Sequence, residues 1–144
     1  MMLGHVRDRF PRLSLSLPGR SGPLVIEFIV DTGFDGDLAL PQSIVNRLEA
    51  TASDAHDVRL ADGSQQARAY YEISLEWQEE DRLTEVLVLE SQPLLGVGLM
   101  DGHLLQAEMQ TGGEVSLERV RHFAPVPHCI EWQLLSTCAE IGYN

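Results

Sequence analysis

The segment Phe28-Ile29-Val30-Asp31-Thr32-Gly33-Phe34 joins an apolar run to a carboxylate, a hydroxyl and a glycine. It ends the stretch 24–30, whose nearly continuous apolar character is typical of a buried strand. A carboxylate at the end of such a strand is costly to bury unless it is hydrogen-bonded or shares a proton, and Gly33 permits close approach of another backbone. Alone, this tripeptide indicates only a turn at a strand end, so its meaning depends on the rest of the chain.

The surrounding pattern predicts a mainly β domain. Apolar residues alternate strictly over 12–17, which is the period of a half-buried strand. Pro41 stands where a helix often begins, a short helix is expected at about 97–101, and a last hairpin near 111–113. The pair Asp62-Gly63 predicts a tight hairpin turn. The expected strands cover residues 12–17, 24–30, 38–40, 58–61, 67–77 and 83–89.

One order of elements occurs twice along the chain. The strand 24–30 is followed by a loop, the apolar segment 38–40 and a helix. The strand 86–89 is followed by a loop, the apolar segment 94–96 and a short helix. Two such halves indicate a pseudo-symmetric β fold.

Composition excludes several classes of protein. The chain has 144 residues, of which 44% are hydrophobic and 22% charged, as expected for one globular domain. Its formal net charge of -12 would be repelled by a nucleic acid or an anionic membrane. It has no apolar run long enough for a spanning helix and no apolar core of a secretory signal. Two cysteines are too few for a disulfide framework. We therefore expect a cytoplasmic protein.

Taken together, these motifs resemble the retropepsin-like aspartic proteases of clan AA, in particular the small bacterial members. The matching elements occur in the family's order over about residues 12–120. They are the apolar strand into Asp31, the hairpin at 60–64, a long strand with Trp77, and Leu94-Leu95-Gly96 before a short helix. The resemblance implies an all-β half-barrel with one or two short helices, spanning 1–121 and forming a dimer. The tail 122–144 is expected to be a separate, helical segment.

The resemblance also implies a site and a mechanism. Aspartic proteolysis needs two carboxylates about 3 Å apart that share one proton. The chain has a single Asp-Thr-Gly, so the second catalytic carboxylate must be Asp31 of another copy. Thr32 and Gly33 would form the active-site loop, with Thr32 bracing it. The expected flap, which would close over a polypeptide substrate, consists of Ala61, Asp62, Gly63 and Ser64.

Two positions depart from the family pattern. Phe34 stands where members usually carry Ala or Ser, and it would narrow the cleft. Gly98 stands where retroviral-type members usually carry Asn or Asp, and it would remove a polar contact. Both favour an alternative function, a catalytically silent module that binds peptides or assembles a complex. The intact Asp31-Thr32-Gly33 favours a homodimeric aspartic endopeptidase.

Metal and nucleotide sites are not expected. An EF-hand starting at Asp31 would need oxygen ligands where the chain has Gly33 and Gln42. Gly96-Val97-Gly98 lacks the third glycine of a dinucleotide fingerprint. The remaining candidate ligands fit no usual zinc spacing; they are His122, His128, Cys129 and Cys138. We therefore expect no metal and no cofactor.

Overall fold

The computed structural model describes residues 1–59, 62–63 and 65–120. It is mainly β, as predicted, with one mixed sheet of ten strands and two helices of four residues each. No helix in these ranges is long and apolar enough to cross a membrane. In chain order the elements are β1 (Met2–Arg7), β2 (Phe10–Leu17), β3 (Leu24–Val30), β4 (Leu38–Leu40), α1 (Gln42–Val45), β5 (Thr51–Arg59), β6 (Gln65–Trp77), β7 (Glu80–Val88), β8 (Leu94–Leu95), α2 (Val97–Met100), β9 (His103–Ala107) and β10 (Glu114–Arg119).

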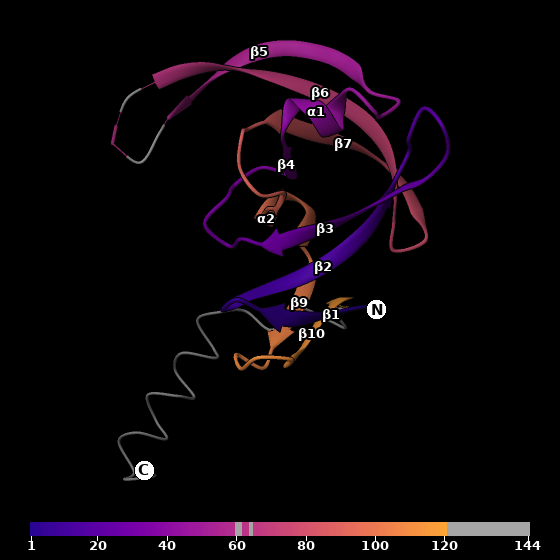
Figure 1. Cartoon of the computed structure of the whole chain (residues 1–144), viewed down its shortest axis with the longest axis vertical. Helices are drawn as coiled ribbons and strands as arrows, with labels where there is room; N and C mark the ends of the chain where they lie inside the picture. The colour runs from indigo at the N-terminus through magenta and orange to yellow at the C-terminus, as the bar shows by residue number, and fades with distance from the viewer. Residues whose placement is uncertain (60–61, 64, 121–144) are drawn as a thin grey trace, which may run out of the picture.

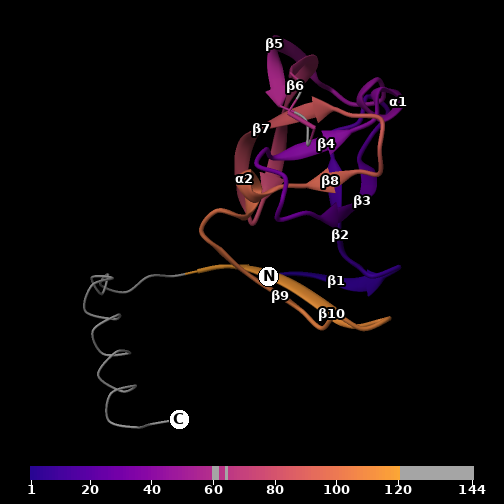
Figure 2. The same ribbon diagram turned by 90° about the vertical axis from the view of Figure 1, so that its left-hand side faces the viewer.

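The sheet is open and strongly curved. Its strand order is β5-β6-β7-β4-β8-β3-β2-β1-β10-β9, so β5 and β9 are its two edges. The long β5–β6 hairpin arches over one end of the molecule (Figure 1). At the other end β1, β9 and β10 lie together below the rest of the sheet (Figure 2). The part between these two ends holds both short helices and the central strands.

Strand patterning explains the core. In β2, Leu13, Leu15 and Leu17 are buried while the serines between them are exposed, as the alternation predicts. The last three residues of β3 are buried, and β4 consists of three fully buried residues. Each fully buried leucine or phenylalanine contributes about 1.5–3 kcal/mol relative to an exposed one. This continuous core holds the loops between the central strands in place.

The predicted internal repeat is confirmed by the strand pairing. The end of β3 pairs in parallel with β8, with Val30 opposite Leu95. In the same way the end of β7 pairs in parallel with β4, with Val88 opposite Leu40. The two short strands β4 and β8 pair with each other antiparallel. Each half therefore supplies the short strand that the other half needs.

The sequence patterns missed β1 and misplaced some boundaries. The turn between β1 and β2 has positive φ at Asp8 (51°) and Arg9 (70°), a conformation that favours Gly and Asn. Without those residues the hairpin gave no sequence signal. Gln78 and Glu79 form a similar turn, so β7 begins at Glu80, three residues before the expected start. The expected tail helix lies outside the described residues.

Candidate active site

Asp31 lies directly after β3, at the start of loop 31–37. Its backbone N–H donates to the carbonyl of Leu95 at 2.9 Å, which ties the loop to β8. Its carboxylate accepts a hydrogen bond from the Gly33 N–H at 2.9 Å, and the Phe34 N–H donates to its carbonyl at 3.2 Å. These bonds form a tight turn and hold the carboxylate at the surface end of the strand. Thr32 and Gly33 are exposed in this turn.

The half-buried Asp31 lies in an open cleft of about 570 Å³, which we call the Asp31 cleft. The cleft brings loop 31–37 together with loop 89–93, so the two repeated halves contribute to one surface. The carboxylate therefore avoids the cost of full burial. The residues lining the cleft are Phe10, Ile29, Val30, Asp31, Thr32, Leu89, Ser91, Gln92 and Leu94.

The repeat places Leu89 at the position that corresponds to Asp31. Asp31 follows β3 and donates its N–H to the carbonyl of Leu95 in β8. Leu89 follows β7 and donates its N–H to the carbonyl of Leu40 in β4, at 3.0 Å. Since the backbone environments match, the chemical difference lies in the side chains. The chain has one carboxylate where its fold has two equivalent positions.

A second cleft, of about 510 Å³, begins where the Asp31 turn ends. We call it the Arg68 cleft. It lies between loop 31–37 and strands β6 and β7, and sequence analysis did not identify its side chains because they come from three separate segments. The lining residues are Gly33, Phe34, Asp35, Gly36, Asp37, Arg68, Tyr70, Glu85, Leu87 and Leu89.

Phe34 packs over glycines and lines the Arg68 cleft, not the cleft that contains Asp31. A Cβ atom added at Gly96 would come within 2.7 Å of both the Phe34 ring and the Phe34 carbonyl. A Cβ atom added at Gly36 would come equally close to the ring, at 2.6 Å. The bulky Phe34 is therefore accommodated by these two glycines.

The corner around Gly98 has its own polar contacts. Arg82 donates to the Gly98 carbonyl at 2.8 Å and lies 3.8 Å from the Asp37 carboxylate. Asp37 also accepts a hydrogen bond from the Glu85 N–H at 3.1 Å. A side chain at residue 98 would collide with the Asp37 carboxylate. The expected loss of a polar contact at Gly98 is thus offset by the Asp37–Arg82 pair.

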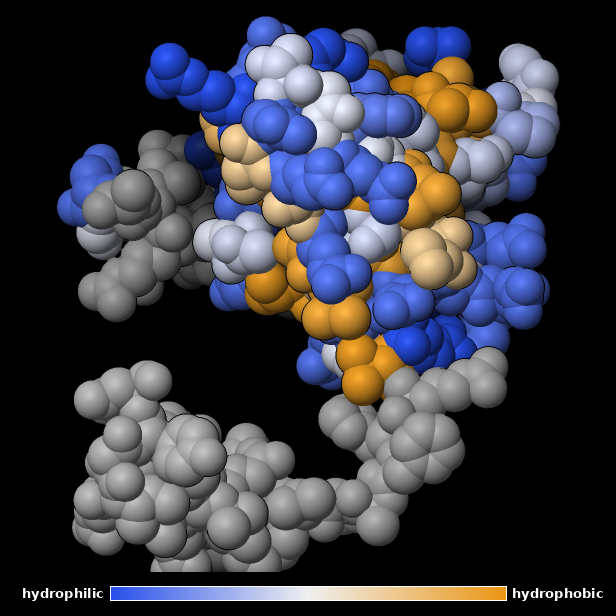
Figure 3. All heavy atoms as spheres, turned by 90° about the horizontal axis from the view of Figure 1, so that it is seen from below, coloured by the Kyte–Doolittle hydropathy of each residue, from blue (hydrophilic) through white to orange (hydrophobic). Residues whose placement is uncertain are grey.

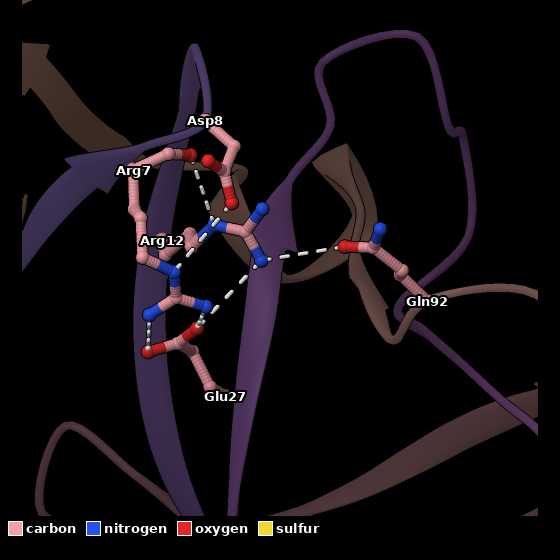
Figure 4. Close-up of polar contacts among 5 residues, drawn as sticks. All are labelled: Arg7, Asp8, Arg12, Glu27 and Gln92. Atoms are coloured by element: carbon pink, nitrogen blue, oxygen red, sulfur yellow. Dashed lines mark hydrogen bonds and ion pairs between the residues drawn. The ribbon is translucent and has the colours of Figure 1, made fainter. Parts of the chain in front are cut away.

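A network of charged side chains links the first hairpin to loop 89–93 (Figure 4). Arg12 is 8% exposed and donates to the Arg7 carbonyl at 3.2 Å and to the Gln92 amide oxygen at 3.3 Å. Glu27 pairs with Arg7 through two hydrogen bonds and lies 3.6 Å from Arg12. The hydrogen bond from Arg7 lowers the pKa of Glu27, against a smaller opposing effect of burial. Arg12 thereby holds Gln92 at the rim of the Asp31 cleft.

The predicted hairpin turn is confirmed, whereas its role as a flap stays a prediction. Asp62 and Gly63 form an exposed turn at the end of the β5–β6 hairpin, and Gly63 has a φ of +86°, as the Asp-Gly pair predicts. Ala61 and Ser64 lie outside the described residues. The hairpin arches over the side of the molecule on which loop 31–37 lies (Figure 1).

The described ranges contain no cluster of three or more His, Cys, Asp or Glu side chains arranged to hold a metal ion. The four candidate zinc ligands of the tail lie outside these ranges.

No protein-family model matches the chain. A comparison with curated proteins also finds no similar sequence. We therefore infer the function from the geometry of Asp31 and its two clefts.

Proposed function

We propose that this chain is a homodimeric aspartic endopeptidase of the retropepsin-like type. The observation that carries the proposal is the accessible Asp31 carboxylate at the end of a buried strand, with Leu89 at the corresponding position of the second half. A chain with one such aspartate supplies half of a catalytic pair. The second half would be Asp31 of another copy, related by a two-fold axis.

In this mechanism the two Asp31 carboxylates share one proton. The ionised carboxylate takes a proton from a water molecule, which attacks the peptide carbonyl, while the protonated partner polarises the carbonyl oxygen. Thr32 would brace the paired loops. The β5–β6 hairpin, with Gly63 at its turn, would close over the peptide and exclude water.

Exposed apolar side chains on the terminal strands support self-association. Leu3 is 62% and Leu104 43% exposed. Leu3 pairs with Ser116 and Leu104 with Glu118, two positions along β10, so both leucines lie on the same face of the sheet. Figure 3 shows apolar side chains exposed among hydrophilic ones on the side that carries β1, β9 and β10. A second copy covering them would gain about 25 cal/mol per Å² of apolar surface.

The test combines oligomeric state and peptidase activity. Sedimentation should show a dimer, and the dimer should cleave a mixed peptide library between about pH 4 and pH 7 with a bell-shaped profile. A statine-type transition-state analogue should inhibit it. Asp31→Asn should abolish cleavage, while Asp81→Asn, at an exposed aspartate in β7, should not. A dimer that binds peptides but cleaves none would instead be the silent peptide-binding module.

A further inference from the structure

The Arg68 cleft adjoins the Asp31 turn but takes no part in the proposed chemistry. It shares Leu89 with the Asp31 cleft and includes Gly33 and Phe34, the second and third residues after Asp31. A peptide bound across Asp31 would therefore place a neighbouring side chain at its entrance. The charges that line it decide which side chain fits.

The cleft is lined by an arginine that has an unused hydrogen-bond donor. The Nε atom of Arg68, on β6, is buried and has no hydrogen-bond partner among the described residues. None of the ion pairs found in the described part of the chain includes Arg68. A buried donor left without an acceptor is destabilising. A ligand that brings an acceptor oxygen into this cleft would meet the Arg68 side chain, which lines it.

Carboxylates line the same cleft. Burial raises the pKa of Tyr70, and the nearby carboxylates of Glu85 and Asp35 raise it further. Both carboxylates are exposed at the mouth of the cleft. The third carboxylate, Asp37, is already engaged by Arg82 and by the Glu85 N–H. Glu85 and Asp35 therefore remain as acceptors near Tyr70.

We propose that the Arg68 cleft selects a peptide side chain that ends in an amide, glutamine or asparagine, next to the scissile bond. The amide oxygen would accept a hydrogen bond from Arg68, and the amide N–H₂ would donate to Glu85 or Asp35. Arg68 is thus a specificity-determining residue. This inference rests on the proposed peptidase function, since it names the substrate class of the same site.

A charged side chain matches only one of these two kinds of group. A substrate carboxylate would satisfy Arg68 but would face two carboxylates of like charge. A substrate lysine would satisfy the carboxylates but would leave the Arg68 donor without an acceptor. An aliphatic side chain would leave both kinds unpaired. Among these side chains, only the amide carries both a donor and an acceptor at its end.

The experiment uses octapeptides with a hydrophobic pair at the centre and one variable position, moved along the peptide. The variable residue is Gln, Asn, Glu, Lys or Leu. At one position the Gln or Asn peptide should have a kcat/KM about tenfold above that of the Leu peptide. The highest value for Glu or for Lys, or equal values at every position, would overturn the inference.

Variants test which residues of the cleft cause the preference for Gln over Leu. Arg68→Met should remove the preference, so that the Gln and Leu peptides have similar kcat/KM values. Arg47→Met, at an exposed arginine just after α1, is the matched control and should keep the preference. Glu85→Gln is a second test should Arg68→Met fold poorly, because the Glu85 side chain is exposed and its backbone N–H bond to Asp37 is retained. It should weaken the preference, and an unchanged preference would contradict the role assigned to Glu85 as an acceptor.

A binding measurement separates this inference from the proposed function. Fluorescently labelled Gln and Leu peptides are titrated with the Asp31→Asn protein, which cannot cleave them. Tighter binding of the Gln peptide, lost on adding Arg68→Met, supports the cleft assignment even if wild type cleaves no peptide. In that case the peptidase proposal fails and the specificity stands. Equal affinities of the two peptides would overturn the specificity whatever the activity.

Discussion

The two halves of the repeat share a backbone plan but differ in their loops. Loop 31–37 contains three aspartates, and its backbone carbonyls accept N–H bonds from α2 and the residue before it, among them Gly96 to Asp37 at 2.8 Å. Loop 89–93 contains one carboxylate, Glu90, which accepts the N–H of Gln42 at the start of α1, at 3.0 Å. One loop presents its acid to a cleft, and the other uses its acid to support a helix.

This difference shows that two halves with equivalent backbones need not carry the same reactive side chain. Parallel pairing and burial make the two halves equivalent as backbone, and the hydrogen bonds of Asp31 and Leu89 match. Chemistry depends on the side chain placed at that equivalent point, and only the first half has a carboxylate there. A site that needs two such carboxylates has to be completed by another copy of the chain.

The largest effect is expected at Asp31. Asp31→Asn retains the shape of the side chain and removes its ionisable group, so activity should fall at least about 100-fold while the fold and the dimer persist. Mixing equal amounts of mutant and wild type, with free subunit exchange, should leave roughly a quarter of the all-wild-type rate if both copies are needed. Independent subunits would leave roughly half. If activity fell in proportion to the fraction of mutant chains, with subunit exchange verified separately, Asp31 would not be half of a pair shared between two copies.

The contact between the halves is tested at Gly96. In Gly96→Ala the new methyl group would collide with the Gly36 and Phe34 carbonyls, so loop 31–37 would have to shift. We expect a loss of about 3 kcal/mol in the free energy of unfolding, measured with urea. Val97→Ala, at the neighbouring and more exposed residue, should cost less than about 1 kcal/mol. Equal losses for the two variants would mean that close loop packing does not matter here.

Glu90 tests whether the carboxylate of the second loop has a structural role, in contrast to Asp31. Glu90→Ala removes the acceptor for the Gln42 N–H, so unfolding should become easier by about 1 kcal/mol. Peptidase activity should not change, because this carboxylate supports α1. Thermal unfolding and a peptide cleavage assay on the same sample measure the two effects. Loss of activity without loss of stability would assign Glu90 to the catalytic site.

The smallest effect is expected at Glu27, in the network that ties β3 to the second loop. The pKa of this carboxyl is lowered in the folded protein, so its contribution is complete above the pKa of the unfolded chain and disappears as pH falls through the folded value. Because the side chain is 39% exposed, the contribution should stay below about 1 kcal/mol. Glu27→Gln should therefore reduce the drop in unfolding free energy between pH 7 and pH 3. An identical drop in both proteins would show that Glu27 does not contribute to the loss of stability at low pH.

Sequence patterns predicted most of the central strands because the burial of a strand determines which of its neighbouring residues are apolar. The alternation in β2 and the apolar run of β3 are direct consequences of which side chains face the core. The turn at Gly63 was predictable because a positive φ favours glycine. The turn at Asp8 and Arg9 adopts positive φ without glycine, so β1 left no comparable signal.

The sequence by itself determined that the chain is mainly β, that the Asp-Thr-Gly follows a buried strand, and that it occurs once. Each of these depends on residues close together in the chain. Only the tertiary structure decided that Leu89 corresponds to Asp31, that Gln92 is held by Arg12, and that Arg68 and Glu85 line one cleft. These relations join segments far apart in sequence. They are set by strand pairing and core packing, for which a single sequence carries no local pattern.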